Sequence, residues 1–585
     1  MSSEVRMTPT ATRPTATHRW RVAPSARLPG AHTRMRSGVR RLLMWTPPAL
    51  AVVGALLGWS GSLVPSLLPR PWLLQAAISA VAISVGYLLG LLAAKVIARL
   101  SRRVQPSVAR HIAPGIAMSV AALLTWTLGL HYLWRSDVNR IMGMDGSVAL
   151  YLLAAFVAGG SLGYLVLVLF RVAHRMWLVA VRHLTRWMTA GVAKSIVLGV
   201  VLVSAVLVFD ALIVGRLAGA VSDAYLDATL SYDGDVVRPS LGTLAGGPGS
   251  LISWDEIGRQ GREFVASART RAELEEFSGR PGADPVRVYA GLESAETAGD
   301  RARLAVDELE RAGGFDRAAL VMITPTGTGW VDPYAIDPVE FIYNGDTAAV
   351  AIQYSHLPSW VLLIGNQDVA IESSRALFEE IVQRLNAVDE DERPRLFLYG
   401  ESLGSFALEA VFADLHEVRE QTDGVLWVGP SRMNRLWQTL ISERSADTPV
   451  WRPVVGEGAS VRFGPDGVTL ASVEGLWEAP RVAYLQHASD PITWLSTDLI
   501  FQRPEWLDPP RGPDVSRWMP YVPGVTFLQV LVDLVMGTNA PIGHGHKFGA
   551  AQAEAWALIT SPKTWSTTDT QRLRSLIEDD LGEDR

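Results

Sequence analysis

Five long apolar stretches near the N-terminus constrain this chain more than any other feature of its sequence. About 20 apolar residues are needed to cross the hydrocarbon core of a bilayer as a helix. The first four stretches contain no Asp, Glu, Lys or Arg, and the fifth contains only Asp210, near one end. A core helix of a soluble protein rarely runs this far without a charge. We therefore predict a bundle of five transmembrane helices at 42–69, 71–94, 112–134, 146–170 and 195–215.

Basic residues orient these helices, because short loops rich in Lys and Arg stay on the cytoplasmic side. The 41-residue head carries nine Arg and one Glu, and segments 95–111 and 171–194 carry five positive residues each. The connection between the first and second predicted spans contains only Arg70 as a charged residue. The connection between the third and fourth contains Arg135 and Arg140 together with two Asp. An odd number of spans that starts inside ends outside, so we predict an extracytoplasmic C-terminal part at the cell membrane. One span more or fewer would reverse this assignment.

The net charge of −6 hides two parts of opposite sign. Up to Arg216 there are 23 Lys and Arg against 4 Asp and Glu, which leaves 30 against 55 for the remainder. A basic, apolar first part favours a membrane surface, and the acidic remainder disfavours nucleic acid because it repels phosphate. The chain has no Cys, which excludes disulfides, thiolate metal ligands and cysteine nucleophiles. We predict no metal and no cofactor.

These patterns divide the chain into four parts. Residues 1–41, with the stretch TPTATRPTAT and no apolar periodicity, are predicted to be a disordered basic segment. Residues 42–216 form the membrane domain, whose first span is too extended for a cleaved signal peptide and is predicted to remain as an anchor. A linker at 217–250, ending in SLGTLAGGPGS, leads to a second domain at 251–585.

The second domain alternates short apolar runs with helical patterns, among them 371–388 and 403–416. Strands that are apolar throughout and alternate with helices indicate an α/β fold with a parallel sheet covered on both faces. Ligands of such sheets bind beyond the carboxyl ends of the strands. The predicted strands are 317–324, 347–355, 395–399, 424–428 and 481–487.

The sequence Gly400-Glu401-Ser402-Leu403-Gly404 follows one of these strands and opens a predicted helix. G-x-S-x-G in this setting is the pattern of a nucleophile elbow, in which a strained backbone projects the serine above the sheet. Glycines flank the serine because larger side chains would collide in so tight a turn. The pattern alone also occurs in ordinary turns, but the strand before it and the helix after it favour Ser402 as a nucleophile.

A serine nucleophile needs a base, and folds with this elbow follow the chain order nucleophile, acid, base. The second domain contains five histidines: His356, His416, His487, His544 and His546. His356 precedes the elbow, and His416 lies in the predicted helix after it. His487 ends a strand that comes too early in the chain. The glycine-rich loop PIGHGHKFG remains, and we predict His546 as the base with His544 as the alternative. The second histidine then caps the following helix or supports the first.

The acid that orients the base should follow a strand between the serine and the histidine. Asp490 lies three residues past the strand predicted at 481–487 and is followed by Pro491. Asp-Pro is also a common turn, but the position between Ser402 and His546 favours the acid role. Asp508, in a Pro-rich loop without a preceding strand, is the fallback.

Acyl transfer also requires hydrogen-bond donors for the developing oxyanion. The N–H of Leu403, directly after the nucleophile, is one predicted donor. The other is expected from the loop TPTGTGWVDP, where we choose Thr326. This loop is also rich in glycine, but no GK[ST] follows, so a phosphate-binding P-loop is disfavoured.

These motifs resemble the α/β-hydrolase superfamily. More narrowly, PVRVYAGL, RARLAVDELERAGGFDR, TPTGTGWVDP, GDTAAVAIQYSHLPSW, GESLGS and GHGHKFG together resemble a bacterial family that pairs an α/β-hydrolase catalytic domain with an N-terminal multi-span membrane domain. The resemblance covers nearly the whole chain from the first span onward. It implies a serine-hydrolase mechanism carried by Ser402, Asp490 and His546, and it names no substrate.

The leading interpretation is a membrane-anchored serine hydrolase, esterase- or lipase-like, that acts on acyl esters beside membrane lipids. An acyltransferase that uses the same triad is a close alternative. A non-catalytic membrane protein that keeps the hydrolase fold as a binding module is the alternative from another class. A transporter is disfavoured, because the predicted spans carry almost no charge inside the membrane.

Overall fold

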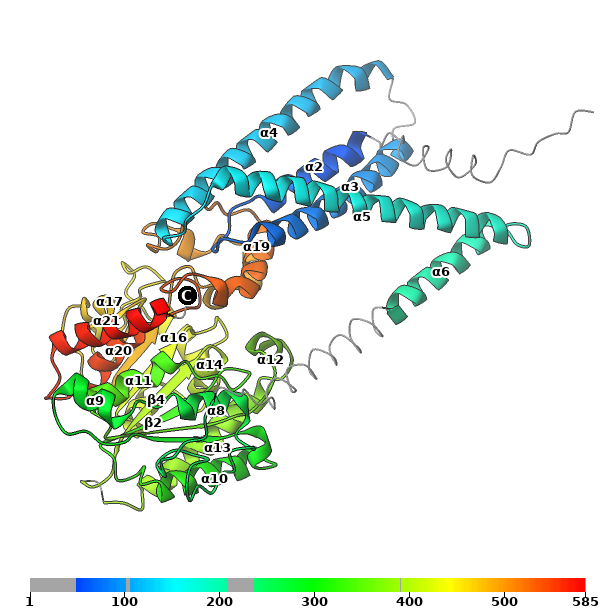
Figure 1. The fold of residues 1–585 in the computed structure, drawn as a ribbon. Helices are drawn as coiled ribbons and strands as arrows, with labels where there is room; N and C mark the ends of the chain where they lie inside the picture. The colour runs from blue at the N-terminus through cyan, green and yellow to red at the C-terminus, as the bar shows by residue number, and fades with distance from the viewer. Residues whose placement is uncertain (1–48, 101–105, 209–235, 390, 584–585) are drawn as a thin grey trace, which may run out of the picture.

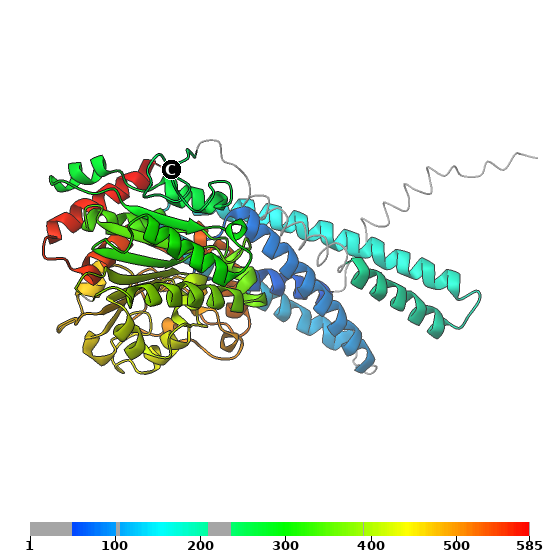
Figure 2. The same cartoon turned by 90° about the horizontal axis from the view of Figure 1, so that it is seen from below.

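The computed structural model describes residues 49–100, 106–208, 236–389 and 391–583, and shows a group of helices joined to an α/β domain (Figure 1). Figure 2 shows the same helices projecting from one side of that domain. The predicted head at 1–41, Asp210 and residues 217–235 of the predicted linker lie outside the described residues, as do the outer ends of the first and fifth predicted spans.

Helices α2 to α6 lie at the five predicted spans. Within the described residues, three segments are long and apolar enough to cross a membrane, namely Trp72–Ile97, Pro114–Ile141 and Val148–Leu184, which indicates a membrane protein. Helix α2 has 14 residues and ends at Ser62, so residues 63–69, predicted as part of the first span, are an irregular connection instead. The count of five spans stays a prediction. The bounds are α2 Ala49–Ser62, α3 Trp72–Leu100, α4 Pro106–Ile141, α5 Val148–Leu184 and α6 Ala190–Val208.

Glycines let α2 and α3 pack backbone against backbone. A Cβ atom added at Gly54 would lie 2.2 Å from Gly86 O, and one added at Gly58 would lie 2.1 Å from Ala82 O. Small residues at such contacts allow helices to associate in lipid, where the hydrophobic effect between helices is absent. Helices α2 and α3 therefore form a tight pair, against which α5 also packs.

The α/β domain is built on a seven-stranded parallel sheet in the order β1-β3-β2-β4-β5-β7-β6. All five predicted strands are present, and the predicted α/β fold class is confirmed. The edge strands β1 and β6 were not predicted, because a buried arginine interrupts each apolar run, Arg287 in β1 and Arg462 in β6. The bounds are β1 Val286–Ala290, β2 Ala319–Thr324, β3 Thr347–Ile352, β4 Arg395–Glu401, β5 Gly424–Val428, β6 Val461–Gly464 and β7 Arg481–Leu485.

Helices cover both faces of the sheet, as Figure 1 shows. Helices α10, α13 and α14 pack together on one face, and α11, α20 and α21 pack together on the other. The helix predicted at 403–416 ends at Glu409, and a separate helix, α15, carries His416. The α-helix bounds are α8 Gly258–Ala266, α9 Arg271–Ser278, α10 Ala298–Arg311, α11 Pro333–Ile342, α12 Ser359–Gly365, α13 Asp368–Leu385, α14 Leu403–Glu409, α15 Leu415–Gln421, α16 Arg435–Ser442, α17 Gly467–Ala471, α18 Pro491–Trp494, α19 Val525–Asp533, α20 Ala551–Thr560 and α21 Thr567–Glu583. The short 3₁₀ helices are η2 Leu292–Ser294, η3 Gly456–Gly458, η4 Thr497–Ile500, η5 Glu505–Leu507 and η6 Leu534–Asn539.

The connection between α2 and α3 is bonded to the α/β domain and packs into its core. Asp533, the last residue of α19, accepts hydrogen bonds from Leu67 N (2.9 Å) and Leu68 N (3.2 Å). The same carboxylate forms a buried ion pair with Arg70 (2.8 Å). From α4, Asp137 accepts a hydrogen bond from Ser516 Oγ (2.7 Å). The side chains of Leu67 and Leu68 belong to the same hydrophobic core as the sheet, so the helices and the α/β domain form one folded structure.

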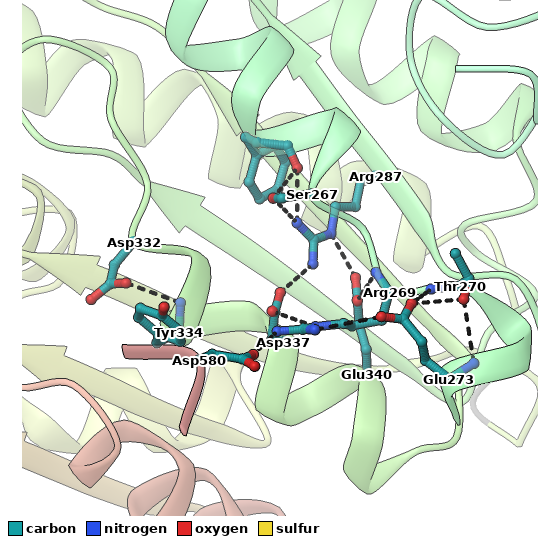
Figure 3. Close-up of polar contacts among 11 residues, drawn as sticks. Ser267, Arg269, Thr270, Glu273, Arg287, Asp332, Tyr334, Asp337, Glu340 and Asp580 are labelled. Atoms are coloured by element: carbon teal, nitrogen blue, oxygen red, sulfur yellow. Dashed lines mark hydrogen bonds and ion pairs between the residues drawn. The ribbon is translucent and has the colours of Figure 1, made fainter. Parts of the chain in front are cut away.

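A second buried ionic network holds the edge of the sheet (Figure 3). Arg287 on β1 binds Asp337 (2.7 Å) and Glu340 (2.6 Å) on α11, and all three side chains are at most 2% exposed. Arg269 adds a bond to Asp337 (2.7 Å) and one to Asp580 (2.9 Å) on α21. The network therefore explains how an arginine is tolerated in a buried strand and ties β1 to the helices of one face.

Removing Arg287 should destabilise the α/β domain strongly. The variant Arg287→Met leaves two buried carboxylates without their main partner, and breaking a buried ion pair in this way costs about 3–5 kcal/mol of unfolding free energy. Arg271→Met is the control, because Arg271 is 53% exposed and pairs with Asp284 at the surface, where a pair is worth less than about 1 kcal/mol. Urea unfolding of the detergent-solubilised chain measures both, and equal losses in the two variants would contradict the assignment.

Candidate active site

Ser402 lies at the tight turn between β4 and α14 and has a strained backbone, with φ 56° and ψ −120°. The two flanking glycines are required by close contacts. A Cβ atom at Gly400 would lie 2.7 Å from Gly404 O, and one at Gly404 would lie 2.2 Å from Thr324 O on β2. The Ser402 N–H donates to Val428 O at the end of β5 (2.9 Å). The residues of the predicted elbow thus adopt the conformation that an elbow requires.

Asp490 and His546 form a buried hydrogen-bonded pair behind this turn. His546 Nδ1 lies 2.6 Å from Asp490 Oδ2, and the two side chains are 4% and 0% exposed. Asp490 follows β7 and caps α18, since its other oxygen accepts from Ile492 N (2.9 Å). The carboxylate is therefore fixed by the helix while it orients the imidazole. This bond leaves Nε2 as the atom of His546 that can exchange a proton.

The imidazole of His546 lies beside the elbow. A Cβ atom at Gly429, the residue after Val428, would lie 2.2 Å from His546 Cε1, so only a glycine leaves room for the ring. His546 Nε2 is buried and has no hydrogen-bond partner among the described residues. The structure thus places the predicted base, bonded to the predicted acid, beside the turn that carries the predicted nucleophile.

Comparison with protein families gives two matches that together cover most of the chain. A model described as the alpha/beta-hydrolase family matches residues 286–573, and a model described as the N-terminus of that family matches residues 63–268. The chain belongs to this α/β-hydrolase family. No curated protein and no solved structure matches it. Family membership accounts for the hydrolase fold, but the fold by itself assigns no substrate.

Two other histidines and the fallback acid have surroundings that differ from those of His546 and Asp490. His544 is half-buried, its Nδ1 has no partner among the described residues, and burial lowers the pKa of its imidazole. His416 is 80% exposed and lies beside Glu420. The fallback acid, Asp508, pairs with Arg503 at the surface. Of the two histidines in the predicted loop, only His546 contacts the predicted acid.

The sequence did not reveal the residues that fix the histidine loop. Ser489, directly before Asp490, accepts a hydrogen bond from Gly545 N (2.8 Å) and donates to the buried carboxylate of Asp514 (2.5 Å). His487 Nδ1 lies 2.9 Å from Gly545 O. Residues on either side of the acid thus hold the backbone next to the base. The only signal in the sequence for Ser489 and His487 was their position just before Asp490. No sequence pattern pointed to Asp514, the partner of Ser489.

The two predicted oxyanion donors differ in this α/β-hydrolase. The N–H of Leu403 makes no hydrogen bond within the described part of the chain, so it is available to a substrate. The N–H of Thr326 donates to Trp330 O (3.0 Å), and that of Gly327 donates to Ser359 Oγ (2.9 Å). Thr326 as the second donor stays a prediction, and it requires the loop to release that bond.

The competing effects of burial and nearby charge set the proton affinity of the base. Burial lowers the pKa of His546, but the charge of Asp490 and its hydrogen bond outweigh burial, so the pKa is raised above its ordinary 6.5. Among the described residues, no three His, Asp or Glu side chains are placed to hold a metal ion. An imidazole oriented by a carboxylate, with a raised pKa, is able to accept and return a proton.

Glu401, next to the nucleophile, belongs to a buried chain of polar groups. Tyr399 Oη lies 3.1 Å from Glu401 Oε2 and 2.8 Å from Gln552 Oε1, and Gln552 Nε2 donates to Asp332 Oδ2 (2.7 Å). Burial, followed by the charge of Asp332, raises the pKa of Glu401 to about 8. Tyr399 has a single proton, so a protonated Glu401 can donate to Tyr399 while Tyr399 donates to Gln552.

Glu401→Gln should make the stability of the protein less dependent on pH. The folded pKa of Glu401 is about 8 against an ordinary 4.5, so the stability linked to its proton is complete below pH 4.5 and is lost as the pH rises to 8. Wild type should therefore lose up to about 1.4 kcal/mol per pH unit across this window, and the neutral variant should lose less. Melting temperatures at pH 5, 7 and 9 measure the difference.

Glu420→Gln is the matched control, because Glu420 is 64% exposed. Its melting temperature should follow that of wild type at every pH. If Glu401→Gln also follows wild type, Glu401 does not hold a proton in the folded state.

Proposed function

We propose that the protein is a membrane-anchored serine hydrolase that cleaves acyl esters. The observation that carries the proposal is the strained elbow at Ser402 with the buried Asp490–His546 pair beside it. A φ of 56° is costly for a serine, and the surrounding glycines and the bond to Val428 O sustain it. A merely structural turn does not require this geometry.

In the proposed mechanism Ser402 Oγ attacks the ester carbonyl while His546 Nε2 takes the hydroxyl proton. Asp490 remains ionised and stabilises the imidazolium. The tetrahedral intermediate expels the alkoxide, which receives the proton from His546 and leaves as an alcohol. Water then attacks the acyl-serine and gives its proton to His546, the acid is released, and Ser402 regains its proton.

The proposed oxyanion donor is the N–H of Leu403 at the first turn of α14, which has no acceptor in the part of the chain that the structure describes. A preorganised donor at this position is worth about 10²–10³ in rate in related chemistry. A second donor from the loop 325–330 requires Thr326 or a neighbour to turn its N–H toward the carbonyl. We propose that this N–H turns toward the carbonyl when the substrate binds.

Acyl transfer to an alcohol is the second candidate, because it shares the acyl-enzyme. It is favoured by the burial of Ser402, which is only 7% exposed, since a site with little access for water preserves an acyl-enzyme until an acceptor arrives. The ratio of free acid to transferred acyl product, measured with glycerol as a defined acceptor, separates the two reactions.

A fluorophosphonate probe should label Ser402 in wild type and leave Ser402→Ala unlabelled. Asp490→Asn should label about 10³–10⁴-fold more slowly, because the imidazole loses its orientation and its partner. The wild-type labelling rate should rise with pH through a midpoint above 6.5, since only the neutral imidazole accepts a proton and its pKa is raised. The midpoint should fall in Asp490→Asn.

Ser373→Ala serves as the control, because Ser373 is a buried serine on α13 whose Oγ has no partner among the described residues. It should label as wild type does. A folded wild-type protein that is not labelled would favour the non-catalytic binding module instead.

We also propose that the catalytic domain lies on the extracytoplasmic side of the cell membrane. The connections 63–71 and 142–147 lie at the ends of the helices that face the α/β domain, and the end of α3 and the turn between α5 and α6 lie away from it (Figure 1). The remote ends carry Arg99, Arg182 and Arg186. Positive loops stay in the cytoplasm, so the domain falls on the opposite side.

The absence of cysteine from the chain allows a direct test of this topology. In intact cells, a membrane-impermeant maleimide should label His416→Cys, since residue 416 is 80% exposed on the α/β domain. Trp187→Cys, at an 80% exposed position in the turn between α5 and α6, should react only after permeabilisation. The reverse pattern would place the catalytic domain in the cytoplasm.

A further inference from the structure

A long apolar groove runs between α2, α3 and α19, where the helices meet the α/β domain. Its volume is about 930 Å³. Two walls come from helices of the predicted membrane domain, and the third comes from the helix that precedes the histidine loop. Side chains on these walls include Leu57, Val81, Val85, Leu89, Leu528 and Val532.

The dimensions and chemistry of the groove match one lipid tail. Along α2 its lining extends from Leu50 to Gly61, about 17 Å at a rise of 1.5 Å per residue. The hydrocarbon core of a bilayer is about 30 Å thick, so the groove is as deep as a single leaflet. Of the described residues that line it, none is charged, and the polar side chains Ser62 and Gln529 lie at the end next to the α/β domain.

The polar end of the groove is bounded by the same helical segment, α19 with η6, that holds the backbone of the proposed base. Gln529 donates to Gly61 O (3.2 Å) and Ser62 O (3.3 Å), and so closes the groove between α19 and α2. Along the same segment, Gly537 O accepts a hydrogen bond from His546 N (3.0 Å). Eight residues of helix separate Gln529 from Gly537, about 12–16 Å at helical rises. One helical segment therefore contacts the polar end of the groove at Gln529 and the backbone of His546 at Gly537.

Two of the apolar side chains that α19 contributes to the groove are also exposed, and the apolar surface continues into η6. Leu528 is 59% exposed, Leu531 is 40% exposed, and Val535, which follows in η6, is 72% exposed. A short helix with such a face lies in the boundary between headgroups and acyl chains. With the helices in the membrane as predicted, the mouth of the groove opens at the bilayer surface, where a lipid can enter from the side.

We propose that this groove holds an acyl chain of the substrate, so that the protein acts on long-chain acyl esters drawn from the adjacent leaflet. The inference rests on the proposed function, since it names the substrate class of the Ser402 site. The tail lies along the seam where α2 and α3 meet, and the ester faces the α/β domain. The groove then selects for chain length, and the identity of the headgroup is left open.

Two neighbouring leucines provide a matched test in the full chain in nanodiscs. Leu89 lines the groove and is 60% exposed, whereas Leu88 is 40% exposed and lies outside the lining. The measured quantity is kcat/KM for 4-nitrophenyl palmitate divided by that for 4-nitrophenyl acetate. Leu89→Trp should lower this ratio at least about tenfold, because a filled pocket excludes the chain. Leu88→Trp should leave the ratio within about twofold of wild type.

Val85→Trp is a second groove variant at a 49% exposed position and should act as Leu89→Trp does. An unchanged ratio in both groove variants, or an equal fall in Leu88→Trp, would overturn the inference. These outcomes differ from failure of the proposed function, in which wild type hydrolyses neither ester and Ser402 is not labelled.

A binding measurement that needs no activity completes the test. A phosphatidylcholine with a diazirine near the end of one acyl chain should crosslink to peptides of α3 and α19 in wild type, and at least about threefold less in Leu89→Trp than in Leu88→Trp. Crosslinking spread equally over the exposed surface of α5 would show ordinary contact with bulk lipid and would contradict a specific site.

Discussion

The buried ion pair of Arg70 and Asp533 joins the helices to the α/β domain, and the position of the proposed base, His546, depends on it. Asp533 accepts bonds from Arg70, Leu67 N and Leu68 N, so its charge is compensated from one short connection. An uncompensated charge in this position would cost several kcal/mol. If the connection between α2 and α3 separated from the α/β domain, the Asp533 carboxylate would be exposed or would remain buried without a partner.

This ion pair bears on the site because α19 continues into the histidine loop. Four residues after Asp533, Gly537 O accepts the N–H of His546 (3.0 Å). Next to the base, a Cβ atom at Gly545 would lie 3.3 Å from Leu68 Cδ2, so the connection between the helices also contacts the loop directly. The helical part is therefore a structural element of the candidate active site as well as an anchor.

The sequence predicted those parts of the site that depend on local geometry. The elbow at Ser402 was recognisable because its glycines are fixed by contacts within a few residues and with one neighbouring strand. Asp490 and His546 followed from chain order. The strands β1 and β6 were missed, because Arg287 and Arg462 break their apolar runs and their partners lie on distant segments. Arg70 stood out as the single charge between two spans, but its partner is 463 residues away and no local pattern connects them.

The sequence also did not predict the direction in which individual backbone N–H groups point. The loop 325–330 is rich in small residues, yet the N–H of Thr326 closes a turn onto Trp330 O (3.0 Å). Its availability depends on a hydrogen bond internal to the loop, and composition does not show this. In the same way, α14 ends at Glu409 and Asp414 caps a new helix, although the apolar spacing continues across the break.

The proposed substrate groove and the proposed base share one supporting element, α19 with η6. Gln529 closes the groove against α2, Asp533 anchors the helix to Arg70, and Gly537 holds the backbone of His546. A displacement of this segment would move the mouth of the groove and the imidazole together. Because interfaces packed around buried charges do not deform gradually, occupancy of the groove and alignment of the base should be coupled. Such coupling requires the α/β-hydrolase domain to pack against the membrane helices, and a flexible tether would not provide it.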